Sequence, residues 1–206
     1  RYDALGIAGP YAMRCDAGPR CPEAYRQEFR HDGVRARNVI ALVPGTDSAR
    51  GREVVVVGAH YDHIGRSGPG VLDPDRGMVA RPGADDNASG TAAVLELARR
   101  LAQRPAARTV LLAHFGAEEM GLVGSRHFVS QPPVPRAAMV AMVNLDMVGR
   151  LGDGELEVLG LRSGEGLRAI VDSVARLHPV RVRLTAGARD NSDHAPFQRE
   201  GIPALH

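Results

Sequence analysis

Five short segments of this chain carry His, Asp and Glu side chains in a number and chemistry that suit a pair of divalent metal ions. They lie at residues 59–63, 83–90, 116–121, 144–147 and 192–197. Imidazole nitrogen and carboxylate oxygen are the common non-sulfur ligands of Zn²⁺. The leading interpretation is therefore a metal-assisted hydrolase, with zinc as the first candidate for the ion.

The first segment contains His60 and Asp62, two residues apart after an apolar run. If strand geometry continues through them, both side chains point to the same side. A metal-ligating His usually donates its second ring N–H to a carboxylate, and Asp62 is placed to accept that bond. The tripeptide alone is more typical of a solvated loop, so its meaning depends on the other segments.

The second segment contains Asp85 and Asp86, just ahead of a predicted helix. Asp is favoured at helix N-caps, which is one interpretation of the pair. The other is a carboxylate that bridges two metal ions, with Gly83 and Gly90 letting the backbone approach closely.

Acidic residues follow two further apolar runs. Glu118 and Glu119 are adjacent, and such a pair is costly without a cation because the carboxylates repel. One Glu can bind a metal while the other takes a proton from metal-bound water; a helix first turn is the alternative. Asp146 is expected to be a ligand or a cap. The other histidines lack such a context and are assigned to the surface or the core: His31, His63, His114, His127 and His178.

The elements that must position these residues alternate along the chain. His60, Glu119 and Asp146 each come at the end of an apolar strand, and ligands collect beyond the carboxyl ends of strands in α/β sheets. The alternation predicts an α/β fold, a three-layer αβα domain with a mixed, largely parallel central sheet. Strands are predicted at 38–43, 53–59, 109–115, 138–145, 156–161, 180–184 and 202–205, and helices at 22–29, 87–103, 122–129, 164–177 and 195–200.

Two parts of the chain are distinguished by their regularity. Residues 1–36 are predicted to be an irregular N-terminal extension with one short helix, and residues 37–206 to be the catalytic domain. Within that domain, residues 64–82 are rich in Gly, Pro, Asp and Arg and should form a long surface loop.

Composition excludes several classes of function. The net charge of +2 and an aromatic content of 4% give no basis for nucleic-acid binding. No apolar run reaches the ~18 residues of a membrane helix. All 26 basic residues are arginine, so lysine Schiff-base chemistry and a P-loop lysine are both excluded.

The two cysteines bear on the compartment. Cys15 and Cys21 are close enough to close a small loop in an oxidising environment. The chain opens Arg1-Tyr2-Asp3 without an initiator Met, so we expect a processed or trimmed product, in which a targeting segment is open to removal. A bridge between the two cysteines would agree with export to the periplasm or the extracellular space, which the family resemblance described below implies.

Taken in order, the five segments resemble the motifs of the aminopeptidase Y family of co-catalytic zinc peptidases. The resemblance runs from about Arg37 to His206. It implies two zinc ions: His60 and Asp146 as terminal ligands of one, Asp86 as the bridge, and Glu119 on the second.

The resemblance also implies the remaining roles. Asp62 would orient His60, and Glu118 would be the general base that moves a proton from the attacking water to the leaving amine. The substrate would be a peptide, and the resemblance favours an aminopeptidase over a carboxypeptidase or a dipeptidase. The family also implies a cis peptide bond after the bridging carboxylate, here between Asp86 and Asn87.

The chain departs from the family pattern at the second zinc. The family's fifth ligand is a His beyond the strand that corresponds to residues 202–205, and this chain ends at His206. We therefore expect a chain truncated at its C-terminus, with an incomplete second site and poor activity by itself. The alternative is that His194 or His206 replaces the missing ligand.

Two rival functions share the fold. A glutaminyl-cyclase-like acyltransferase uses a single zinc ion, but the run from Asp86 to Gly90 fits the peptidases better. A non-catalytic peptidase-like domain would have lost ligand residues, of which four of five are present here. The sequence gives no view of residue specificity or of oligomeric state.

Overall fold

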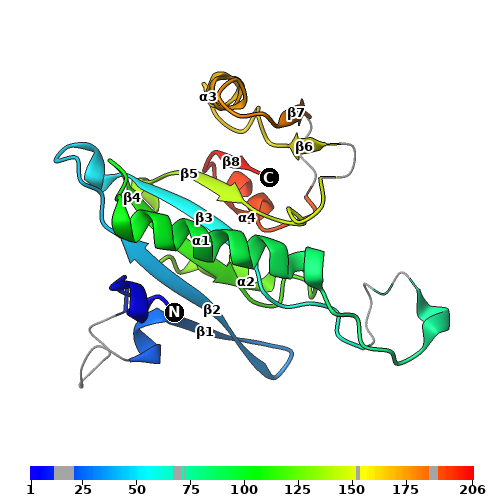
Figure 1. Ribbon diagram of the computed structural model, residues 1–206. Helices are drawn as coiled ribbons and strands as arrows, with labels where there is room; N and C mark the ends of the chain where they lie inside the picture. The colour runs from blue at the N-terminus through cyan, green and yellow to red at the C-terminus, as the bar shows by residue number, and fades with distance from the viewer. Residues whose placement is uncertain (12–20, 67–70, 72, 152–153, 186–189) are drawn as a thin grey trace.

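The computed structural model describes residues 1–11, 21–66, 71, 73–151, 154–185 and 190–206. Its centre is a six-stranded sheet in the order β1-β2-β4-β3-β5-β8 (Figure 1). Strand β3 is parallel to β4 and to β5, β5 is parallel to β8, and β2 is antiparallel to β1 and β4. The strands are β1 (Arg26–His31), β2 (Val34–Val43), β3 (Val54–His60), β4 (Thr109–Phe115), β5 (Met139–Asn144) and β8 (Ala204–Leu205).

Helices cover both faces of this sheet, as predicted for a three-layer αβα fold. Alternate residues of one strand point to opposite faces. Leu112 of β4 belongs to the cluster around Val94 of α1 (Gly90–Gln103). Its neighbour Leu111 belongs to the cluster around Phe128 and Phe197, which come from α2 (Val123–Ser130) and α4 (His194–Arg199). Burial on both faces explains why the centre of β3 is a run of valines.

The parallel strands β3, β4 and β5 end at the same edge of the sheet. Close contact between β3 and β4 keeps this edge compact, because a Cβ at Gly58 would lie 2.5 Å from Cε2 of Phe115. The loops that follow the three strands therefore meet, and these loops carry the predicted site residues.

The N-terminal segment differs from the prediction. The predicted helix at 22–29 is wrong beyond Tyr25, because Arg26–His31 is strand β1, paired with β2 across the turn at Asp32. Gln27 and Phe29 are buried while Glu28 and Arg30 are exposed, which is the period of a strand. The segment 26–36 is thus a regular edge of the sheet and not an irregular extension. The domain boundary at residue 36 stays a prediction.

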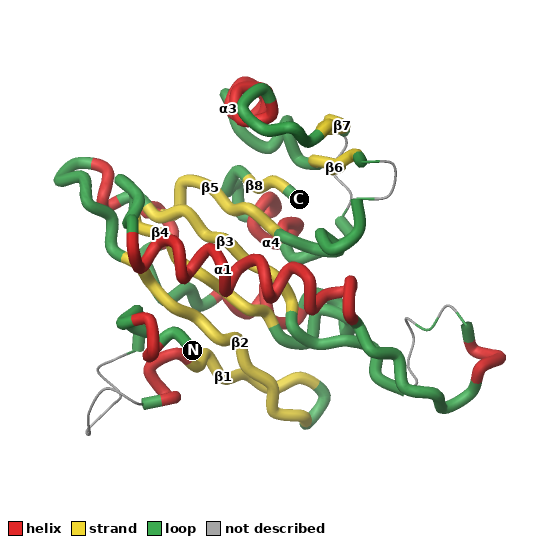
Figure 2. The backbone as a smooth tube through the Cα atoms, in the orientation of Figure 1, coloured by secondary structure: helices red, strands yellow, loops and turns green. Residues whose placement is uncertain are grey.

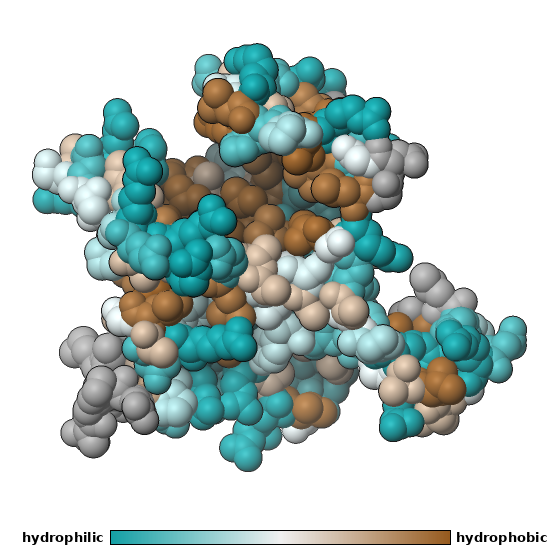
Figure 3. Space-filling view, viewed as in Figure 1, coloured by the Kyte–Doolittle hydropathy of each residue, from teal (hydrophilic) through white to brown (hydrophobic). Residues whose placement is uncertain are grey.

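A smaller unit lies beside β8. It contains a separate two-stranded parallel sheet of β6 (Glu155–Val158) and β7 (Arg181–Leu184), with α3 (Leu167–Ala175). The strands predicted at 156–161 and 180–184 therefore exist but lie outside the central sheet. Leu159 and His206 exchange two main-chain hydrogen bonds that attach this unit to the end of β8. Figure 3 shows hydrophobic residues on and below α3, where Ile170 and Val174 are exposed.

The rest of the described chain is loops and short helical turns (Figure 2). The part of residues 64–82 that is described is loop apart from one turn, as predicted. None of the described helices has the length and apolarity to cross a membrane. Cys15 lies outside the described residues, and so does the predicted bridge to Cys21. The turns are Asp3–Leu5, Pro22–Tyr25, Arg50–Arg52, Pro74–Arg76 and Arg136–Ala138, together with a π-type segment at Ala84–Ser89.

Candidate metal centre

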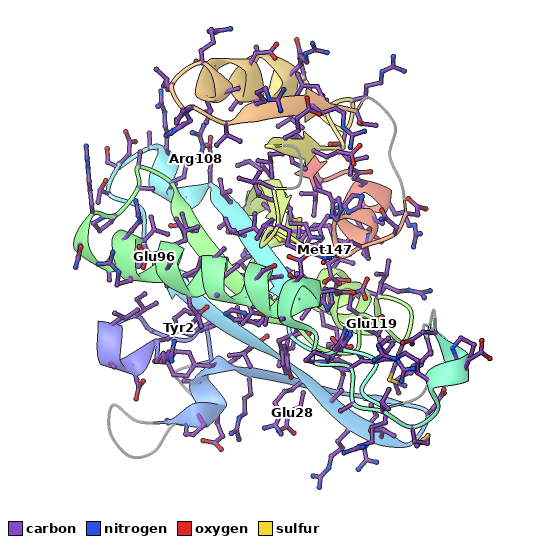
Figure 4. The ribbon with its side chains drawn as sticks, turned by 45° about the vertical axis from the view of Figure 1, so that its right-hand side comes forward. Tyr2, Glu28, Glu96, Arg108, Glu119 and Met147 are labelled. Carbon is purple, nitrogen blue, oxygen red and sulfur yellow. The ribbon has the colours of Figure 1, made fainter. Side chains whose placement is uncertain are left out.

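The predicted site residues come together where the loops after β3, β4 and β5 meet the start of α1. His60 is the last residue of β3. Glu118 and Glu119 lie just after β4, and Asp146 just after β5. Figure 4 shows Glu119 near the end of α1 at which these loops converge.

His60 is the most buried member of the site, with 1% of its surface exposed. Its Nε2 atom lies 3.2 Å from Oδ1 of Asp86 and 3.3 Å from Oδ1 of Asp146. Its Nδ1 atom lies 3.1 Å from the main-chain carbonyl of Asp62, which is placed to accept a hydrogen bond from it. That bond leaves Nε2 facing the two carboxylates, which is the orientation a ligating imidazole needs.

The Asp62 carboxylate has a different position from the one expected. Its oxygens accept hydrogen bonds from the main-chain N–H groups of Glu118 (3.1 Å) and Glu119 (3.3 Å). The separation between its Oδ1 and Nδ1 of His60 is longer, at 3.9 Å. The side chain of Asp62 therefore holds the acidic loop after β4, and its main chain holds the imidazole.

The adjacent aspartates have separate roles. The Asp85 carboxylate accepts hydrogen bonds from the main chain of Gly149 (2.9 Å) and from Nε of Arg150 (2.8 Å), so it fixes the loop after β5. Asp86 faces the site instead. The peptide bond between Asp86 and Asn87 is cis, as the family resemblance predicted. Neither aspartate acts as a side-chain N-cap of α1.

Asp86 lies between two groups of potential ligands. Its Oδ1 atom is near Nε2 of His60, and its Oδ2 atom lies 3.9 Å from Nδ1 of His63. His63 Nδ1 is also 2.9 Å from Oε1 of Glu119. One group of metal-capable side chains is His60, Glu118 and Asp146, and the other is His63, Asp86 and Glu119.

Asp146 is held by a chain of polar side chains. Ser192 donates a hydrogen bond of 2.8 Å to Oδ2 of Asp146, and Asn144 donates one of 2.7 Å to the Ser192 hydroxyl. Ser192 is fully buried. These contacts leave Oδ1 of Asp146 directed at His60, so Ser192 is a positioning residue that sequence reasoning left without a role.

Burial and mutual charge shift the ionisation of the site. Burial raises the pKa of Glu118 to about 8. Burial also raises the pKa of Asp86, and raises that of Glu119 with help from the charge of Asp86. Burial opposes a charged His60 ring, but the hydrogen bond and charge of Asp146 raise the pKa of His60 to about 10. Without a cation, the site thus holds protons that a free carboxylate would release.

These residues fit a divalent cation. Two donors bound at ~2.1 Å with tetrahedral angles are about 3.4 Å apart. The distances of 3.2 Å and 3.3 Å from His60 to its two aspartates match that spacing. The donor set of imidazole and carboxylate suits zinc, and a cation would replace the protons that repulsion between carboxylates otherwise requires.

The structure thus brings together all six residues singled out in the sequence. They are His60, Asp62, Asp86, Glu118, Glu119 and Asp146. It also adds His63, which had been assigned to the surface or core. The sequence did place His63 directly after His60-Tyr61-Asp62. However, side chains alternate along a strand, and that alternation would put His63 on the opposite side from His60. The alternation does not apply to His63, because β3 ends at His60.

The two candidates for a replacement ligand lie elsewhere. His194 is fully buried and packs against His206, with ring centroids 4.7 Å apart. His206 Nδ1 lies 3.1 Å from the side-chain nitrogen of Asn144. Among the described residues, the metal-capable group that contains Glu119 has His63 as its imidazole and neither of these two.

Comparison with known proteins points to one family. The model of peptidase family M28 matches residues 38–206. Leucine aminopeptidase 1 of Ajellomyces dermatitidis is 36% identical over 181 residues, which is 81% of this chain and 44% of that protein. Aminopeptidase YwaD of Bacillus subtilis is 35% identical over 162 residues, 75% of this chain and 31% of its own length.

Solved structures agree with the sequence relatives. The zinc aminopeptidase BSAP from Bacillus subtilis has a TM-score of 0.66 and 30% identity, over 84% of this chain and 40% of that one. The chain therefore spans less than half the length of the relatives it matches here.

Proposed function

This chain belongs to peptidase family M28, and we propose that it is the catalytic part of a zinc-dependent aminopeptidase that hydrolyses peptides from the N-terminus. The similarity to leucine aminopeptidases and to a zinc aminopeptidase structure supports the activity and the metal. The resemblance inferred from the five motifs agrees with this family.

One observation carries the proposal. The Asp86 carboxylate directs one oxygen toward His60 and the other toward the group that contains Glu119. A carboxylate in this position is suited to bridge two ions. We assign His60 and Asp146 to one zinc, Asp86 to both, and Glu119 to the second.

A bound zinc ion supplies Lewis acidity toward the peptide carbonyl and makes water a better nucleophile. Glu118 is assigned as the general base. Burial raises its pKa to about 8 while the site holds no cation, and a cation beside it would favour the ionised carboxylate. That carboxylate would accept a proton from water and return it to the leaving amine. Asp62 and Ser192 do no proton transfer in this scheme. They hold the loop of Glu118 and the orientation of Asp146 respectively.

The test is zinc content together with hydrolysis of leucyl-p-nitroanilide and short peptides. We expect bound zinc and release of the N-terminal residue, both lost on dialysis against a chelator and restored by zinc. Glu118→Gln should bind zinc as before and lose about 100- to 10,000-fold in kcat, the usual range for a general base. Because the chain spans less than half the length of its relatives, the full-length protein is assayed beside it. Zinc binding by the full-length protein without hydrolysis of any peptide would contradict the proposal, and cyclisation of an N-terminal Gln peptide would favour the acyltransferase.

Export of the protein stays a prediction. It is supported by the closeness of Cys15 and Cys21 in the sequence. Recovery of the protein from the periplasm or the medium of its native host would support export, and recovery from the cytoplasm alone would contradict it.

A further inference from the structure

The hairpin of β1 and β2 carries arginines on one face. Residues two apart along a strand point to the same side, and so do residues directly opposite on the neighbouring strand. Arg30 lies opposite Arg35, and Arg37 and Val39 follow at intervals of two along β2. Val39 packs against the cluster that contains Val94 of α1. The arginines therefore point to the same side of the sheet as α1.

The charge of this face is positive and is not neutralised within the part of the chain that the structure describes. Its charged residues are Arg26, Glu28, Arg30, Arg35 and Arg37, which are four arginines and one glutamate. Among the described residues, the ion pairs of the hairpin involve Arg26 and His31. None includes Arg30, Arg35 or Arg37, and all three of these side chains are exposed.

The pairing of Arg30 with Arg35 opposes folding, because like charges directly opposite each other destabilise a sheet. The small sheet beside β8 has the favourable arrangement. There, Glu157 of β6 lies opposite Arg183 of β7 and binds it at 3.3 Å. The hairpin therefore keeps a positive field that an anionic ligand would neutralise.

The arginine face lies at the edge of the sheet where the loops of the metal centre meet. The pairing of β2 with β4 begins at Val39, so residues 34–38 extend ~17 Å past the carboxyl end of that pairing. The hairpin leaves the sheet at the end where α1 begins (Figure 1). The hydroxyl of Tyr61, the residue after His60, donates a hydrogen bond of 2.8 Å to the main-chain carbonyl of Arg37.

An extended peptide held at the metal centre would reach this face. Strand β2 lies two strands away from β3 in the sheet, which is ~10 Å at the usual spacing of strands. An extended chain spans ~3.4 Å per residue, so about the fourth to the sixth residue of such a peptide would lie over the hairpin. Carboxylates at those positions would meet guanidinium groups, which bind carboxylates through two parallel hydrogen bonds.

We propose that the exposed face of the β1–β2 hairpin, with Arg30, Arg35 and Arg37, binds acidic side chains of the peptide substrate downstream of the residue that is released. This inference rests on the proposed aminopeptidase function. The position of the face beside the metal centre favours a peptide substrate over a separate polyanion. The face contributes binding and takes no part in hydrolysis, so acidic residues in the peptide should lower KM and leave kcat unchanged.

The first experiment compares two peptides on the full-length protein. They are Leu-Ala-Ala-Glu-Ala-Glu and Leu-Ala-Ala-Gln-Ala-Gln, both amidated at the C-terminus, and their variable residues point to one side of an extended chain. At low ionic strength, we expect kcat/KM for release of leucine to be about 3- to 10-fold higher with the Glu peptide, as two exposed charge pairs would give. The difference should shrink in about 0.5 M salt, because exposed charges are screened.

The second experiment assigns the preference to the hairpin. The ratio of the two kcat/KM values is the readout, so a general loss of activity cancels. Arg30→Gln/Arg35→Gln should bring the ratio close to one, and Arg30→Glu/Arg35→Glu should favour Leu-Ala-Ala-Arg-Ala-Arg. The matched control is Arg52→Gln/Arg104→Gln, which removes two exposed arginines just before β3 and just after α1, at the opposite edge of the sheet. The control should keep the ratio of the unaltered protein.

The outcomes separate this inference from the proposed function. Equal kcat/KM values for the Glu and Gln peptides in the unaltered protein would overturn the inference, and a hairpin covered by another part of the full-length protein would give that result. A preference that survives in Arg30→Gln/Arg35→Gln would overturn it as well. In both cases, hydrolysis of leucyl-p-nitroanilide would leave the proposed function standing. If no peptide and no anilide is hydrolysed, the proposed function fails and this inference fails with it.

Discussion

The Asp62 carboxylate accepts two main-chain hydrogen bonds from the loop that carries the proposed general base. Asp62→Asn replaces one acceptor oxygen by an NH₂ group, which then faces an N–H of Glu118 or Glu119. A hydrogen bond to a charged group contributes about 1.5–3 kcal/mol. Because the Asp62 side chain is 24% exposed, solvent replaces part of that bond. We expect the free energy of unfolding to fall by about 1–2 kcal/mol.

The effect on catalysis should be larger than the effect on zinc. A displacement of ~1 Å in a reacting group can cost about 100-fold in rate, so we expect kcat of Asp62→Asn to fall about 10- to 100-fold. The main-chain carbonyl that lies near Nδ1 of His60 remains in this variant. Zinc affinity at the His60 site should therefore change less than the roughly 10-fold typical for a lost outer partner.

The assay combines urea unfolding in a chelator, zinc titration and kcat on leucyl-p-nitroanilide. Asp47→Asn is a matched control, because the Asp47 carboxylate accepts main-chain hydrogen bonds from Ala49 (2.9 Å) and Arg50 (2.8 Å). Asp47 lies beside the start of β4, at the edge of the sheet opposite the site. It should leave kcat unchanged. If excess zinc restores the full kcat of Asp62→Asn, Asp62 acts through His60 and the reasoning is refuted.

Two further perturbations test the electrostatics of the site. Ser192→Ala removes the donor to Oδ2 of Asp146 and should lower zinc affinity about 10–100-fold in a zinc titration. The control Ser130→Ala, at an exposed helix end, should leave zinc affinity unchanged. Equal zinc affinities in the two variants would contradict the positioning role of Ser192. Burial raises the pKa of Glu118 from its ordinary 4.5 to about 8, so between these values the zinc-free native state holds a proton that the unfolded chain lacks. The Glu118 carboxyl therefore lowers the free energy of unfolding by about 1.4 kcal/mol per pH unit as the pH rises between its two pKa values. Urea midpoints measured across this pH range should fall less steeply with pH in Glu118→Gln than in the unaltered protein. An identical pH dependence in the two proteins would contradict the raised pKa of Glu118.

Most strands and helices follow from local pattern. The valines of β3 and the apolar run of β4 are continuous because both faces of the sheet are covered. Strand β1 was missed because a glutamine occupies an inward position. Gln27 is buried through hydrogen bonds with the carbonyl of Gln131 and the side chain of Asn38. A buried polar residue hides the alternation of a strand, and its partners are far away in the sequence.

The sequence by itself determined the family, the αβα layers and six of the residues at the site, because ligand types at the ends of apolar strands are a local pattern. The tertiary structure decided which atoms of those residues face one another. It turned Asp85 toward the loop after β5 and Asp86 toward His60. It also placed His63 beside Glu119. These arrangements depend on where loops from separate strands meet, and short-range spacing does not encode the contact between such loops.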